Sequence, residues 1–89
     1  MTKNVETGDA RIDWLLGLVG DELYSALRKF PAFNSPHEGK AVIEEELDEL
    51  WDHVKQNTGR SRSAQDEAIQ TAAMALRYVY DLSERGPSR

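Results

Sequence analysis

The chain has 89 residues, the length of one small domain, and 30% of them are charged. Sixteen acidic against eleven basic residues give a net charge of −5, which disfavours a nucleic-acid polymer as partner, because polynucleotide binding needs a basic surface. The absence of cysteine excludes disulfides, thiolate metal sites and thiol chemistry, and no apolar run approaches the ~18 residues of a membrane span. We therefore expect a cytoplasmic protein with no membrane partner.

Apolar residues that recur every three or four positions predict an all-α fold with three helices. The predicted helices cover residues 9–29, 36–56 and 63–83. We find no alternating pattern typical of a β-strand in the sequence. Residues 9–83 are therefore expected to form one helical domain, with short flexible ends at 1–8 and 84–89.

The second and third predicted helices carry capping signals at their starts. Ser35 stands directly before Pro36 and three residues before Glu38, which is the pattern of a capping box with proline at the first helical position. Ser63 and Asp66 have the same spacing, so they form a second plausible box. These signals predict helix starts at Pro36 and at about Ser63.

Each predicted helix has one broad apolar stripe, but some apolar residues fall outside it. Trp14 and Leu18 lie off the stripe of the first helix, and Met74 and Tyr78 off that of the third, which suggests a second packing surface. Trp51 lies on the stripe of the second helix, so we expect it in the core. Because a short chain buries little surface by itself, we expect this three-helix chain to assemble into a larger helical bundle as a homo-oligomer, a dimer or a tetramer.

The second predicted helix contains six acids in nine residues, the run EEELDELWD from Glu44 to Asp52. An acidic run on a helix is most often a solvated face. Here, however, Glu45 precedes Glu49 and Asp48 precedes Asp52 by four residues, and like-charge pairs at this spacing destabilise a helix by about 0.2–0.5 kcal/mol each. A bound cation would relieve this repulsion. Oxygen ligands without cysteine favour hard cations such as Mg²⁺, which commonly joins carboxylates to substrate phosphates.

Two segments, FPAFNSPHEGKAVIEEELDELWDHVKQ and DEAIQTAAMALRYVYDL, resemble small members of the MazG-like all-α nucleotide pyrophosphohydrolases. The family signature is EExxE on one helix and ExxD on the next. Glu45, Glu46 and Glu49 match the first half of this signature. The second half is matched in part by Glu67, because Gln70 stands where the signature has Asp. The resemblance covers a little over half of the chain.

The resemblance implies a Mg²⁺-dependent hydrolysis of nucleoside triphosphates to nucleoside monophosphate and pyrophosphate. It implies that Glu45, Glu49 and Glu67, together with Gln70, would hold the metal, and that Glu46 would be an outer ligand or general base. A metal-activated water would attack between the α- and β-phosphates.

Three basic residues near the acidic sides of the helices are candidate phosphate contacts, although each residue type is common as a solubilising group: Lys40, Lys55 and Arg77. Gln70 would lower the charge of the site by one, since an amide replaces a carboxylate. This substitution leaves an alternative function open, that of a catalytically weakened relative acting as a nucleotide-binding or protein-interaction module.

Overall fold

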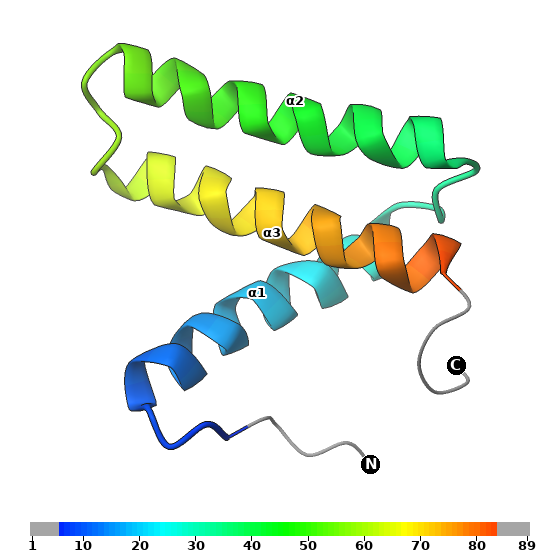
Figure 1. Cartoon of the computed structure of the whole chain (residues 1–89), viewed down its shortest axis with the longest axis horizontal. Helices are drawn as coiled ribbons and strands as arrows, with labels where there is room; N and C mark the ends of the chain where they lie inside the picture. The colour runs from blue at the N-terminus through cyan, green and yellow to red at the C-terminus, as the bar shows by residue number, and fades with distance from the viewer. Residues whose placement is uncertain (1–5, 84–89) are drawn as a thin grey trace.

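The computed structural model describes residues 6–83, which contain three α-helices and no strand (Figure 1). The helices are α1 (Ala10–Lys29), α2 (Pro36–Lys55) and α3 (Arg62–Leu82). The predicted all-α fold is thus confirmed for this part of the chain. The predicted ends fall largely outside it, at residues 1–5 and 84–89. None of the described helices combines the length and the apolar character needed to cross a lipid bilayer.

Helix α3 is the central element of the fold. It packs against both α1 and α2, whereas residues 10–29 and 36–55 make no helix–helix contact with each other. Figure 1 shows α2 running alongside α3 in the opposite direction, while α1 diverges from α3 toward its own N-terminal end. The side chains of α3 therefore decide how the other two helices are placed.

The starts of α1 and α2 follow the local signals of the sequence. Asp9 caps α1, because its Oδ1 accepts hydrogen bonds from the N–H groups of Arg11 and Ile12 over 2.9 and 3.1 Å. Ser35 caps α2 as predicted, with its Oγ accepting from the N–H of Glu38 over 3.1 Å. The carboxylate of Glu38 accepts from the N–H of Asn34 over 2.8 Å, one residue before the N–H that a regular capping box predicts.

Helix α3 starts earlier than predicted. Its N-cap is Ser61, whose Oγ accepts a hydrogen bond from the N–H of Ala64 over 3.1 Å, so the assignment of this role to Ser63 is wrong. The N–H of Ser61 also closes a turn onto the carbonyl of Thr58 over 3.0 Å. Because this turn completes the chain reversal at Ser61, the first helical residue is Arg62.

A close approach at Gly39 brings α2 against α3. A Cβ atom at this buried glycine would lie 2.7 Å from Cδ2 of Tyr78 and 3.1 Å from Cδ2 of Phe33. Tyr78 is half-buried by this contact, so it belongs to the α2–α3 packing and not to the second packing surface predicted for it. A side chain at position 39 would push the two helices apart.

The chain buries very little apolar volume. Among residues 6–83 the buried apolar residues are Ala26, Ala64 and Ala73, and no large side chain is fully buried. Trp51 is 55% exposed, so its prediction as a core residue is wrong for the single chain. The apolar stripe of α2 is wider than the side of the helix that faces α3, and Trp51 lies beyond the contact.

Candidate metal centre

Three carboxylates from two helices come together between α2 and α3. Glu46 and Glu49 belong to α2 and Glu67 to α3, and one oxygen of each lies within 4.8 Å of the others. Glu46 and Glu49 share one side of α2 because they are three residues apart. Glu67 faces them because α3 runs beside α2. We call Glu46, Glu49 and Glu67 the acidic trio.

Two oxygens of the acidic trio are buried without a partner. Oε2 of Glu46 and Oε2 of Glu67 are shielded from solvent and accept no hydrogen bond from the described residues. Glu49 is exposed and closes the group on the solvent side. A buried carboxylate oxygen without a donor is costly, since its lost hydration is not replaced. A bound cation is one way to replace it.

The pKa values of two members of the acidic trio are raised. The pKa of Glu46 lies above its ordinary value mainly because burial disfavours the charged form, and the charge of Glu49 adds to this effect. The pKa of Glu49 is raised first by its hydrogen-bonding contact with Glu67 and then by the charge of Glu67. The shift of Glu46 thus reflects mainly burial, and in both groups neighbouring carboxylates add negative charge, a condition that favours cation binding.

A hollow of about 560 Å³ adjoins the acidic trio, between the three helices and the loop that precedes α2. Glu45 and Glu46 line it from α2, and Gln70 and Met74 line it from α3. Its apolar lining also includes Phe30, Phe33 and Val42. The volume falls in the range of about 300–1,000 Å³ typical of sites for small molecules.

The predicted metal ligands are placed in two groups. Glu49 and Glu67 lie in the acidic trio, where Glu46 joins them as a third member. Glu45 and Gln70 lie beside the trio, in the lining of the hollow. The charge of Glu45 helps to raise the pKa of both Glu46 and Glu49, so it acts on the trio electrostatically. Direct ligation by Glu45 or Gln70 stays a prediction.

Two of the predicted phosphate contacts lie on exposed helix surface. Lys40 forms an ion pair with Glu44 over 2.8 Å, and Lys55 forms one with Asp52 over 3.2 Å. The described lining of the hollow contains neither lysine. Both would need to leave these ion pairs to reach a phosphate in the hollow.

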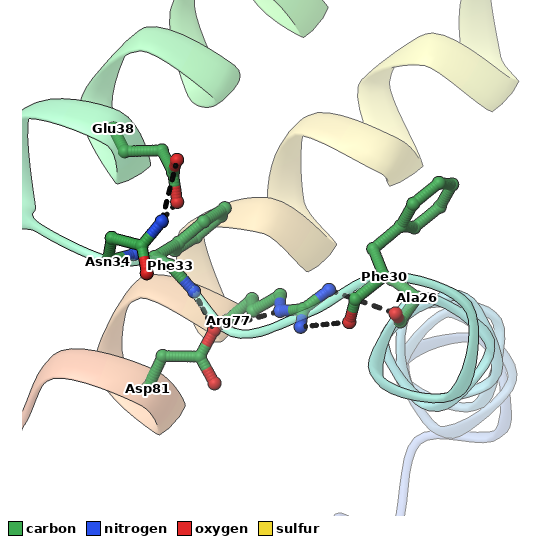
Figure 2. Close-up of polar contacts among 7 residues, drawn as sticks. All are labelled: Ala26, Phe30, Phe33, Asn34, Glu38, Arg77 and Asp81. Carbon is green, nitrogen blue, oxygen red and sulfur yellow. Dashed lines mark hydrogen bonds and ion pairs between the residues drawn. The ribbon is translucent and has the colours of Figure 1, made fainter.

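Arg77, the third predicted phosphate contact, lines the hollow but is used to hold the fold together (Figure 2). It is 2% exposed. Its Nη1 donates to the carbonyl of Ala26 over 2.9 Å and its Nη2 to the carbonyl of Phe30 over 2.8 Å. Its Nε donates to Oδ2 of Asp81 over 2.9 Å. The guanidinium therefore caps the C-terminal end of α1, where it is a second donor to the carbonyl of Ala26, which also accepts from the N–H of Phe30 over 3.0 Å.

Glu22 is a residue of this site that the sequence did not reveal. It lines the hollow from α1, and its charge contributes to the raised pKa of Glu46. No spacing rule connects a single acid on α1 to the cluster on α2, since their proximity depends on how both helices pack against α3.

The comparisons with known proteins gave no relative. No protein-family model, no curated protein and no solved structure matches this chain.

Proposed function

We propose that this protein is a Mg²⁺-dependent nucleoside triphosphate pyrophosphohydrolase, which converts a nucleoside triphosphate and water to a nucleoside monophosphate and pyrophosphate. The observation that carries the proposal is the acidic trio, whose members Glu46 and Glu67 each keep one buried oxygen without a partner. A hollow large enough for a small molecule adjoins these carboxylates.

The donor set fits Mg²⁺ by its chemistry. It consists of carboxylate oxygens, and the chain has no cysteine that could supply a thiolate. When bound, Mg²⁺ would neutralise phosphate charge and lower the pKa of a coordinated water. Since the hollow is lined by Glu22, Glu45 and Glu46, a triphosphate needs such a counter-charge in order to enter it.

Different residues of the chain would hold the metal and accept the proton. Glu49 and Glu67 are the ligands in this proposal, and Glu46 is an outer ligand or the general base. Glu46 suits the second role because it belongs to both the acidic trio and the lining of the hollow. It can therefore accept a proton from a water that attacks a substrate held there.

The EExxE spacing of Glu45, Glu46 and Glu49, which resembles that of MazG-like pyrophosphohydrolases, supports the same function. We further propose that the chain works as a homo-oligomer, a dimer or a tetramer, because many large apolar side chains are exposed on the single chain. Gln70 in the hollow favours the alternative of a catalytically weakened, nucleotide-binding relative.

The test is an assay of pyrophosphate release from a panel of ordinary and damaged nucleoside triphosphates in the presence of Mg²⁺. Glu49→Gln removes one ligand and should lower the rate about a hundredfold or more, as expected for one lost charge-stabilising group. Asp48→Asn is the matched control, because Asp48 is exposed on the same helix and outside the acidic trio. It should retain the wild-type rate.

Pyrophosphate release no greater than that of Glu49→Gln would contradict the enzymatic function. Nucleotide binding that requires Mg²⁺ but gives no turnover would favour the weakened relative. In that case Gln70→Asp, which restores the missing carboxylate, should increase the rate if the amide limits the site.

A further inference from the structure

The outer face of α3 is apolar over four turns. Between residues 68 and 80, every exposed residue of α3 is apolar or aromatic. These residues, which we call the outer face of α3, are Ala68, Ala72, Ala75, Leu76, Val79 and Tyr80. The single charged residue of this stretch, Arg77, is buried. A helix that faces water normally carries polar residues on that side. We therefore expect another protein surface to pack against this face.

Helix α2 extends the apolar surface. Leu47, Trp51 and Val54 follow one another on one side of α2 and are about half exposed. At 100° per residue their mean direction lies about 135° around α2 from the mean direction of Glu46 and Glu49, and the mean direction of the outer face of α3 lies about 140° from Glu67. Both apolar surfaces therefore turn away from the acidic trio, on the opposite side of the α2–α3 pair.

The combined surface has the size of one half of a protein interface. Its six large side chains are 43–55% exposed. At roughly 100–250 Å² for side chains between valine and tryptophan in size, these exposures amount to roughly 300–750 Å² before the alanines are counted. A standard interface buries about 800 Å² on each partner, and the largest apolar patch on a typical monomer is about 300–600 Å².

The charge distribution favours a second copy of this chain as the partner. Two copies each carry a net charge of −5 and repel each other over most of their surfaces. The outer face of α3 has no exposed charge, so two copies can meet there without opposing carboxylates. It also offers no charge that would select a charged partner.

We propose that a second copy of the chain covers this surface, with the outer faces of the two α3 helices packed together about a two-fold axis near Ala72. Ala72 lies at the middle of the face, and its small neighbours Ala68 and Ala75 permit a close approach of two helices. The acidic trio and the hollow stay open on the other side. This proposal locates the self-association and does not depend on the hydrolase activity.

The first experiment measures the mass of the full chain by sedimentation over a range of concentrations. The wild type should form a dimer of twice 10.1 kDa. Ala72→Glu should raise the dimer dissociation constant about a hundredfold or more, since it buries two like charges near the axis. The matched control is Tyr24→Glu, which adds the same charge at an exposed aromatic residue of α1 and should leave the constant unchanged.

The second experiment uses the absence of cysteine in the chain. Ala72→Cys should form a disulfide-linked dimer on mild oxidation, because residues near a two-fold axis meet their own copies. Asp48→Cys, exposed on α2 but outside the surface, should not form one. This readout remains valid if Ala72→Glu does not fold.

A wild-type chain that stays a folded monomer at about 100 µM, where a Kd of 1 μM would give almost complete dimer, would overturn the proposal. In that case the apolar surface would be a binding site for a different protein. A dimer whose affinity Ala72→Glu does not change, and which Ala72→Cys does not cross-link, would also overturn it. If the wild-type chain forms this dimer but releases no pyrophosphate, the proposed function is contradicted and the proposed dimer is not.

Discussion

Arg77 and Asp81 form a buried ion pair one turn apart on α3, with Nε and Oδ2 2.9 Å apart and side chains only 3% and 1% exposed. The pair also joins three segments of the chain. Arg77 donates to the end of α1, and the same Oδ2 of Asp81 accepts from the N–H of Phe33 over 3.0 Å. In a chain with so little buried apolar volume, this network holds α1 and the following loop to α3.

Replacing Arg77 with methionine should lower the free energy of unfolding by about 3–5 kcal/mol, because the buried carboxylate of Asp81 loses the compensating positive charge of Arg77. Urea denaturation measures the change. Arg62→Met is the control, since the ion pair of Arg62 with Asp66 is exposed and such pairs contribute about 0–1 kcal/mol. Equal effects of the two substitutions would contradict the structural role of Arg77.

Two glycine-to-alanine substitutions should have opposite effects. Gly39→Ala should destabilise the fold by about 1–3 kcal/mol, because its Cβ would overlap Tyr78. Gly20→Ala should stabilise it by about 0.5–1 kcal/mol, since a Cβ at position 20 would meet no atom within 4 Å beyond the local helix backbone, and alanine favours a helix. Thermal denaturation of both variants tests the packing, and a stabilising Gly39→Ala would disprove the close approach.

Mg²⁺ should raise the melting temperature of the wild type, because a ligand that binds the folded state stabilises it by mass action. Glu67→Gln should remove most of this rise, since it takes away one carboxylate of the acidic trio. Asp48→Asn should keep the rise. An equal response to Mg²⁺ in all three proteins would indicate general ionic screening instead of a site.

The raised pKa values of Glu46 and Glu49 predict how stability depends on pH without metal. The folded state binds protons at these groups more readily than the unfolded state does, because burial of Glu46 and the neighbouring carboxylates disfavour the charged forms. The charged forms therefore destabilise the fold above the raised pKa values. This destabilisation decreases as pH falls through those values, and it is absent below 4.5, the pKa of the group in the unfolded state.

Glu46→Gln should therefore be more stable than the wild type at neutral pH, and the difference should shrink as pH approaches 4.5. Urea denaturation at a series of pH values measures it. Asp48→Asn supplies the background effect of removing one negative charge from α2. A stability gain that is the same at every pH would show that repulsion in the trio is not its cause.

Local signals in the sequence were enough to predict the three helices and to place two of the three members of the acidic trio on one side of α2. Ser35 caps its own helix through neighbouring N–H groups, so its role depends on nothing distant. Glu46 and Glu49 share a side of α2 by helix geometry alone. The third member, Glu67, could be suspected from the resemblance, but its position opposite them depends on how α2 and α3 are aligned.

Positions set by packing were not predictable from periodicity. Arg77 is a charged residue whose burial depends on carbonyls of α1 that lie about fifty residues earlier in the chain. Trp51 follows the apolar period of α2, yet a period gives the direction of a side chain and not the partner that covers it. The same limit hid Glu22, which reaches the hollow only because α1 and α2 both pack against α3.

The central position of α3 has a consequence for how the chain folds during synthesis. Within residues 6–83, α1 packs against no helix except α3, and its contact through Ala26 and Arg77 spans 51 residues. At about 5–20 residues per second, several seconds separate the synthesis of α1 from that of its partner. Helices α2 and α3 can pair as a hairpin as soon as α3 emerges, so α1, although it is made before them, would be the last of the three to find its place.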